Sequence, residues 1–81
     1  MVRTEDEIRS WLRDRVATAT NVPSSRVRVD EPFAALGVTS SVALEISGDL
    51  EDWLERPIDP TLAWDHPTIN RLAAWLATPA P

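Results

Sequence analysis

The stretch L-G-V-T-S-S-V-A-L-E-I, residues 36–46, places three hydroxyl side chains between a glycine and an apolar pattern with helical spacing. Thr39, Ser40 and Ser41 therefore stand where a helix is expected to begin. A hydroxyl at that place can cap the helix by accepting a hydrogen bond from a backbone N–H group. The same N–H groups and the helix dipole also favour a phosphate there. Taken alone, the pattern favours capping over covalent modification.

The helix predicted from this start ends near Arg56, because Pro57 cannot continue its hydrogen-bond ladder. One face of it is apolar and should be buried: Ala43, Ile46, Leu50, Trp53 and Leu54. Glu45, Asp49 and Asp52 recur at i, i+4 and i+7, so they form an acidic stripe on the outward face. The stripe is interpreted either as a solvated helix face or as a recognition surface.

The predicted first helix begins with a capping box made by Thr4 and Glu7. It runs from about residue 5 to about residue 19, and four apolar residues with helical spacing form its buried face: Ile8, Trp11, Leu12 and Val16. Four charged residues fall largely on its other faces and are interpreted as solvated charges: Arg9, Arg13, Asp14 and Arg15.

Residues 21–38 contain two prolines and no sustained helical period, which predicts a long loop. The V-R-V alternation at 27–29 has no second strand to pair with, so a packed loop is expected there. Five apolar side chains are expected to pin it to the helices: Val22, Val27, Val29, Phe33 and Leu36.

Between Pro57 and Pro67 there is room for only one or two helical turns, predicted from Asp59 or Pro60 to Trp64. Thr68 is expected to cap a last helix, whose buried face is Ile69, Leu72, Ala73 and Leu76. The sequence thus predicts an all-α bundle of three longer helices and one short helix. We expect one domain over residues 1–77, with the four tryptophans in its core or at its boundary, and a disordered tail or linker over residues 78–81.

The composition excludes several classes of function. The chain has 81 residues and a net charge of −5, with 13 acids against 8 basic residues and no lysine. Such a balance argues against binding nucleic acid, since that affinity rests on neutralising phosphates. No apolar run is long enough to span a membrane, so we expect a soluble, cytoplasmic protein. We also expect it to be a monomer. The absence of cysteine excludes disulfides and thiolate chemistry by the chain itself.

A catalytic site is poorly supported. A hydrolase would have to combine a serine with His66 and Asp65, but His66 is the only histidine and Gly37 does not open a nucleophile elbow around Ser40. His66 is better explained as a packing or capping residue. One histidine with scattered carboxylates also makes no metal-ligand set.

Three motifs in combination resemble the acyl carrier protein family, in particular the carrier domains of polyketide synthases. The resemblance runs from the I-R-S-W-L helix through D-E-P-F-A-A-L-G-V-T-S-S-V-A-L-E-I to P-T-L-A-W-D-H-P-T-I-N-R-L-A-A-W-L. It implies that Ser40, in the place of the family's D-S-L serine, carries 4'-phosphopantetheine donated from coenzyme A by a magnesium-dependent phosphopantetheinyl transferase. The thiol of that arm would hold acyl groups as thioesters, and the domain itself would catalyse nothing.

The sequence departs from the family pattern on both sides of the serine. Thr39 replaces an aspartate that helps the transferase, and Ser41 replaces a leucine that partners contact. The resemblance also makes the outward face of the second long helix a partner-recognition surface, formed by Thr39, Ser41, Leu44, Glu45, Asp49 and Asp52. The implied partners are the transferase, an acyl-loading enzyme (acyltransferase or acyl-AMP ligase), ketosynthase and other synthase domains.

Two alternatives stay open at this point. One is a helical interaction or docking domain without a prosthetic group, in which Ser40 serves only as a cap. The other is a peptidyl carrier of nonribosomal synthesis, which the acidic helix and the P-T-I motif disfavour. The acyl cargo, and whether the chain stands alone or comes from a megasynthase, do not follow from these residues.

Overall fold

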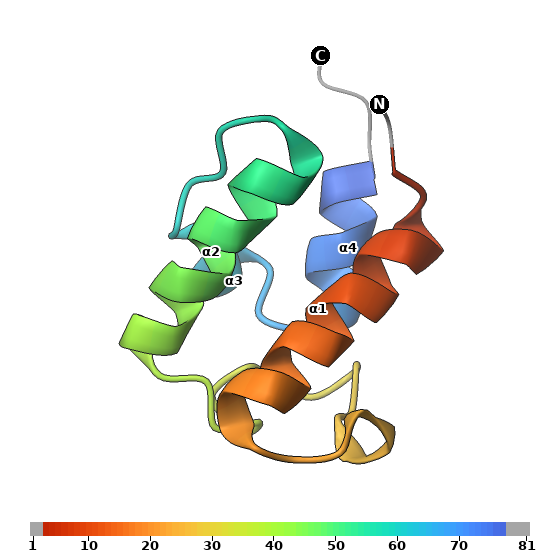
Figure 1. Cartoon of the computed structure of the whole chain (residues 1–81), viewed down its shortest axis with the longest axis vertical. Coiled ribbons are helices and arrows are strands. Elements are labelled where there is room, and N and C mark those ends of the chain that lie inside the picture. The colour runs from red at the N-terminus through yellow and green to blue at the C-terminus, as the bar shows by residue number, and fades with distance from the viewer. Residues whose placement is uncertain (1–2, 78–81) are drawn as a thin grey trace.

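The computed structural model describes residues 3–77, which contain four α-helices and one 3₁₀ turn joined by loops (Figure 1). Three helices are long and one is short, which confirms the predicted all-α fold. The predicted tail, residues 78–81, lies outside the described residues. The elements in chain order are α1 (Glu5–Thr20), η1 (Ser24–Arg26), α2 (Ser40–Leu54), α3 (Leu62–Asp65) and α4 (Ile69–Ala77).

Helix α1 begins with the predicted capping box. The Thr4 side chain accepts a hydrogen bond from the Glu7 backbone N–H at 3.1 Å, and the Thr4 N–H donates to the Glu7 carboxylate at 3.0 Å. This backbone hydrogen bond from Thr4, aided by the Thr4 hydroxyl, lowers the pKa of Glu7. The helix ends one residue later than predicted, with Asn21 as a left-handed C-cap at φ 57°.

The core lies where the apolar faces of α1, α2 and α4 meet. Leu12, Val16, Leu50 and Ile69 are at most 1% exposed. The face predicted for α4 is buried in full: Ile69, Leu72, Ala73 and Leu76. Periodicity therefore predicted correctly which side of each long helix faces inward.

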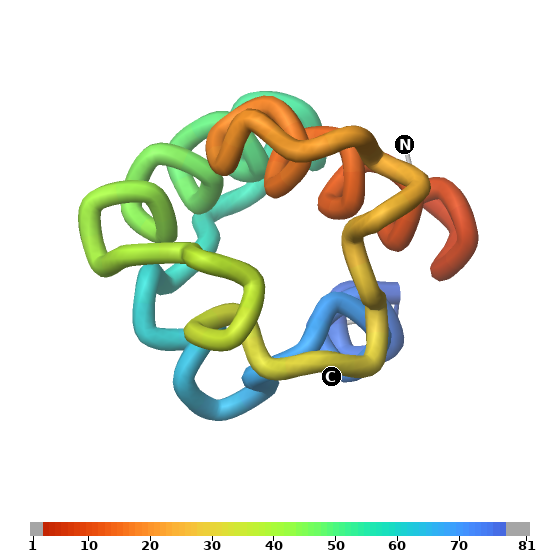
Figure 2. Tube along the Cα trace, turned by 90° about the horizontal axis from the view of Figure 1, so that it is seen from below, coloured from red at the N-terminus to blue at the C-terminus, as the bar shows by residue number. Residues whose placement is uncertain are grey.

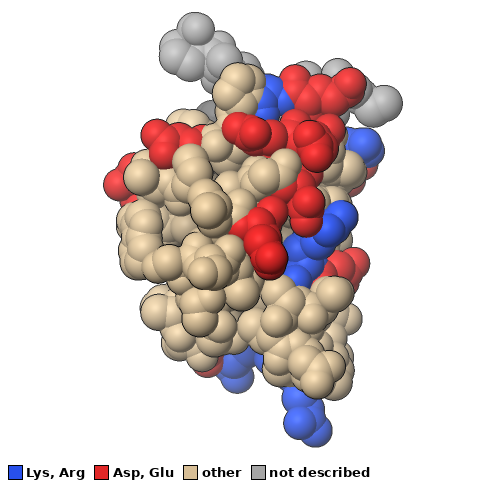
Figure 3. All heavy atoms as spheres, turned by 60° about the vertical axis from the view of Figure 1, so that its left-hand side comes forward, with Lys and Arg blue, Asp and Glu red and all other residues tan. Residues whose placement is uncertain are grey.

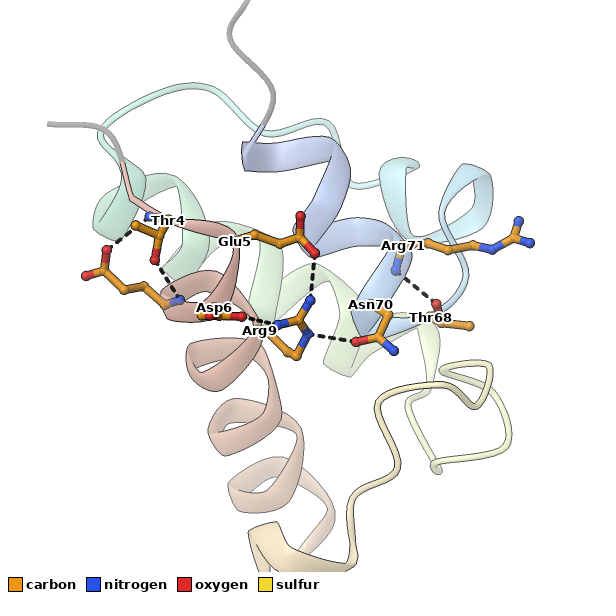
Figure 4. Close-up of polar contacts among 8 residues, drawn as sticks. Thr4, Glu5, Asp6, Arg9, Thr68, Asn70 and Arg71 are labelled. Atoms are coloured by element: carbon orange, nitrogen blue, oxygen red, sulfur yellow. Dashed lines mark hydrogen bonds and ion pairs between the residues drawn. The ribbon is translucent and has the colours of Figure 1, made fainter.

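Arg9 joins α1 to α4 (Figure 4). Its Nε donates to the Asn70 side-chain oxygen at 2.7 Å, while its Nη atoms pair with Glu5 and Asp6. The interpretation of Arg9 as a solvated charge was wrong, because its side chain bridges the two helices. At the start of α4, the predicted Thr68 cap is present: its hydroxyl accepts from the Arg71 N–H at 3.0 Å.

The loop over residues 21–38 closes one end of the bundle and passes α4 on its way to α2 (Figure 2). Val27 and Phe33 are buried, and the Phe33 N–H donates to the Pro67 carbonyl at 2.8 Å. The Val29 carbonyl accepts from the Asn70 N–H at 3.0 Å. The loop is thus packed rather than a strand, as predicted. Val22 was wrongly predicted to be a pin, since it is 37% exposed.

Helix α3 starts later than predicted because Asp59 holds a turn before it. The Asp59 carboxylate accepts from both the N–H and the hydroxyl of Thr61, each at 2.9 Å. The hydrogen bond from the Thr61 N–H, and to a smaller extent the one from its hydroxyl, lower the pKa of Asp59. Residues 59–61 are therefore committed to a turn, and the helix begins at Leu62.

The tryptophans divide into two pairs. Trp11 and Trp53 are half-buried and stack on one another between α1 and α2, with ring centroids 5.1 Å apart. Trp64 is 69% exposed and Trp75 is 45% exposed. The prediction that all four belong to the core or its boundary was wrong for Trp64, which lies on the surface.

The two ends of the bundle are formed by different helix termini (Figure 1). The beginning of α1 and the end of α4 lie at one end of the molecule, and α2 begins at the opposite end (Figure 1). The longest dimension of the molecule is 34 Å.

Candidate functional site

The start of α2 is set by a glycine and a threonine. Gly37 has φ +87°, a conformation that side chains rarely tolerate, and it turns the loop toward the helix. Thr39 is the N-cap: its hydroxyl accepts from the Val42 N–H at 3.3 Å and its carbonyl from the Ala43 N–H at 2.8 Å. The expectation that Thr39 caps the helix is confirmed.

Ser40 is the first residue of α2 and is exposed. Within residues 3–77 its hydroxyl makes no hydrogen bond, and Ser41 beside it is also exposed. Capping is therefore carried out by Thr39 alone. The Ser40 hydroxyl is left accessible and uncommitted, which the interpretation of Ser40 as a cap does not explain.

The N-terminus of α2 also lacks the negative charge that such a helix end usually attracts. Helix α1 has three acids in its first turn, Glu5, Asp6 and Glu7, whereas α2 has none in its first turn. The positive end of the α2 dipole is thus not compensated by acids of its own first turn. A phosphate ester on Ser40 would lie where this field stabilises it.

An apolar cleft adjoins this helix start. It has a volume of about 200 Å³, and it is lined by the N-cap Thr39, by Ala43 of α2 and by the exposed Trp64 of α3. The space inside the bundle, between the core side chains of α1, α2 and α3, is only about 20 Å³. The interior therefore has room for little more than a water molecule.

The outward face of α2 is acidic (Figure 3). Glu45, Asp49 and Asp52 are all exposed, and Leu44 among them is 60% exposed. Basic atoms adjoin the acidic ones on this face, and Asp49 pairs with Arg15 of α1 at 2.9 Å. The structure thus leaves these four residues of the predicted recognition surface exposed on α2. Arg15, predicted to be only a solvated charge, belongs to the same surface.

Within residues 3–77, no hydrogen bond links His66 to Ser40 or to Asp65, as a hydrolase would need. The His66 ring packs against Trp75, with centroids 5.2 Å apart, and its backbone caps α3. His66 is thus a packing and capping residue, as expected. In the described part of the chain, no three His, Asp or Glu side chains are grouped to hold a metal ion. No helix within residues 3–77 is long and apolar enough to cross a bilayer.

Residues 10–76 match the family model described as "Phosphopantetheine attachment site". The chain is 43% identical to part of a phenolphthiocerol/phthiocerol polyketide synthase of Mycobacterium tuberculosis, over 95% of this chain and 4% of that protein. It therefore spans only a small fraction of this relative.

Among solved structures, the chain is similar to a free-standing peptidyl carrier protein from Acinetobacter baumannii, with a TM-score of 0.86 and 40% identity, covering 90% of this chain and 91% of that one. It is also similar to an acyl carrier protein from Anabaena sp. PCC 7120 with a variant phosphopantetheinylation-site sequence. That match has a TM-score of 0.85 and 35% identity and covers 91% and 84% of the two chains.

The family model, the similar polyketide synthase and the similar carrier protein structures all indicate the same family. The chain belongs to the phosphopantetheine-binding carrier domains, which are homologous to carrier domains of polyketide synthases. Members of this family are non-catalytic carriers.

Proposed function

We propose that Ser40 bears the 4'-phosphopantetheine arm, with coenzyme A as donor, and that the domain carries acyl or polyketide intermediates on it. The main support for this proposal is that Thr39 caps α2, so that the exposed Ser40 hydroxyl is not needed for the cap. The arm would supply the thiol that a chain without cysteine lacks, and so hold cargo as a thioester.

The site fits such an arm. The helix dipole at Ser40 is not offset by acids of the first turn, so a phosphodiester there is electrostatically favoured. The cleft beside Thr39 is smaller than the roughly 300–1,000 Å³ pockets that bury a drug-sized ligand, and the bundle interior is nearly full. Neither space beside α2 is large enough to enclose a bulky cargo, which supports presentation of the cargo to partner enzymes.

The recognition surface of this carrier is the outward side of α2, with six residues: Thr39, Ser41, Leu44, Glu45, Asp49 and Asp52. Its acids suit basic patches on the phosphopantetheinyl transferase, the acyl-loading enzyme and the ketosynthase. Binding should weaken as salt screens these charges. Charge reversal at Asp49 and Asp52 that left transferase kinetics unchanged at low salt would contradict this assignment.

The first test is intact-mass spectrometry after incubation with coenzyme A, Mg²⁺ and a broad-specificity phosphopantetheinyl transferase. The wild type and Ser41→Ala should each gain one phosphopantetheine, and Ser40→Ala should gain none. Ser41→Ala is the matched control, because it removes the neighbouring exposed hydroxyl. An unmodified wild type with several transferases would favour a helical interaction domain without an arm.

Thr39 is expected to slow the modification. The threonine caps α2 but gives the transferase no carboxylate next to Ser40. Thr39→Asp retains a capping oxygen and should be modified faster than the wild type. Equal rates for the two proteins would show that this position does not limit the transferase.

A peptidyl cargo is the second candidate, favoured by the similarity to a free-standing peptidyl carrier protein. The attachment chemistry would be the same and only the loading enzyme would differ. Mass spectrometry of the arm-bearing protein can separate the two, after incubation with a fatty acid and an acyl-AMP ligase or with an amino acid and an adenylation enzyme.

A further inference from the structure

Arg15 of α1 reaches across to the acidic face of α2. Its Nη1 donates to the Asp49 carboxylate at 2.9 Å, and its guanidinium carbon lies 4.8 Å from the centroid of the Trp11 ring. Both side chains of the ion pair are about half exposed. A partner that approaches α2 therefore meets a cation from α1 within the acidic stripe.

The guanidinium of Arg15 is held in place by aromatic side chains. Trp11 stacks on Trp53, with an angle of 12° between the rings, and the Arg3 guanidinium lies 4.6 Å from the Trp53 ring centroid. Two arginines thus flank a pair of stacked indoles. Cation–π contact and the ion pair act together on Arg15, so it is more ordered than an isolated surface cation.

Arg15 divides the acids of the stripe into two kinds. Asp49 has an intramolecular cation, whereas Glu45 and Asp52 make no ion pair within residues 3–77. Glu45 and Asp52 are seven positions apart on one helix, which corresponds to roughly 10 Å along its axis. Between them lies Gly48, where nothing stands within 4 Å of the place a Cβ would take.

We propose that Arg15 is part of the partner-recognition surface and selects among basic partners by holding Asp49 in an ion pair. This inference rests on the proposed function. The favoured occupant is a protein surface with two cationic side chains about 10 Å apart, which match Glu45 and Asp52. A partner with a continuous basic strip must displace Arg15 or lie against its positive charge. Such a partner is disfavoured.

The test measures binding of a transferase whose docking surface carries a continuous basic strip, the disfavoured kind of partner, to the Ser40→Ala protein, which cannot be modified at that residue. Arg15→Gln should tighten binding about three- to tenfold at low salt, and the gain should largely disappear at about 0.5 M NaCl. Arg71→Gln is the matched control: it makes the same change in net charge, at an exposed arginine whose side chain points away from its neighbours and has no ion pair in the described chain (Figure 4). It should change binding less than about twofold.

Occupation of Asp49 also predicts that two substitutions are not additive. Asp49→Asn should weaken binding less in the presence of Arg15 than in the Arg15→Gln protein, since only the latter leaves Asp49 open to a partner. Arg15→Lys keeps the positive charge, so this variant should bind the transferase as tightly as the protein with Arg15. That result would exclude a loosened tryptophan stack as the cause of the tighter binding by Arg15→Gln.

Equal effects of Arg15→Gln and Arg71→Gln, additive effects of the Asp49 substitution, or no measurable binding by any variant would each overturn the proposal. These results are separate from the mass gain at Ser40. The binding readout needs no transfer, so a failure of the proposed modification is distinguishable from a failure of the Arg15 selection.

Discussion

The indole of Trp11 on α1 lies flat against the indole of Trp53 on α2, with ring centroids 5.1 Å apart and the rings 12° from parallel. This pair is a contact between the two longest helices of the bundle. Offset stacking of large rings adds to the area that they bury. The stack thus helps to fix where the acidic face of α2 stands relative to α1.

Loss of the Trp11 ring should destabilise the fold. Trp11→Ala removes the stack and the support of Arg15, and we expect a loss of about 2–4 kcal/mol in the free energy of unfolding. Trp64→Ala is the control, because Trp64 is 69% exposed, and it should cost less than about 0.5 kcal/mol. Urea denaturation of the two variants measures the difference, and equal losses would contradict the structural role of the stack.

The two glycines of the chain should respond to alanine with opposite signs. Gly48 is in the middle of α2 with open space around it, so Gly48→Ala should stabilise the protein by about 0.5–1 kcal/mol. Gly37 has φ +87°, so Gly37→Ala should destabilise it by about 1–2 kcal/mol. Thermal unfolding of both variants tests this pair, and a shift in the same direction would refute it.

The hydroxyls of Thr39 and Ser40 should differ in their effect on stability. Thr39→Ala removes the N-cap of α2 and should cost about 1 kcal/mol. Ser40→Ala removes a hydroxyl without a hydrogen bond in the described structure and should cost less than about 0.5 kcal/mol. Chemical denaturation of the two single variants compares them directly. A larger loss for Ser40→Ala would mean that Ser40 is the cap.

Acid should weaken the capping box of α1. Because the N–H of Thr4 lowers the pKa of Glu7 in the folded chain, the unfolded chain binds more protons as the pH falls toward the ordinary glutamate pKa of about 4.3. The stabilisation is therefore present above that pH and is lost as the pH falls through the lowered pKa of Glu7.

Glu7→Gln keeps an acceptor that does not titrate, so it should lose less stability than the wild type between neutral pH and about pH 3. Melting temperatures measured across this range test the prediction, with Glu45→Gln as a control on α2 that leaves the capping box intact. Parallel pH profiles for wild type and Glu7→Gln would show that the box does not depend on the charge.

Sequence periodicity predicted the parts of the fold that depend on local spacing. The inward faces of α1, α2 and α4 and the caps at Thr4 and Thr68 follow from spacings within one helix. The acidic stripe and the exposed Leu44 follow in the same way. Each of these features is decided by residues a few positions apart, which is the information that a helical pattern contains.

Contacts between distant segments could not be predicted in this way. The pairing of Arg15 with Asp49 joins residues 34 positions apart, and that of Arg9 with Asn70 joins residues 61 apart. Trp75 could have been recognised as outward-facing, because it falls off the apolar face of α4. Trp64 lies in a helix too short for any period to show its orientation.

The position of α2 within the bundle has a mechanical consequence. The start of α1 and the end of α4 share one end of a molecule 34 Å long, and Ser40 begins α2 at the other (Figure 1). In any longer chain that continues from both helices, linkers would leave far from the serine. A small rotation of the domain about those linkers would move Ser40 over a long distance. The reach of an arm attached there would then be the sum of this displacement and the length of the arm.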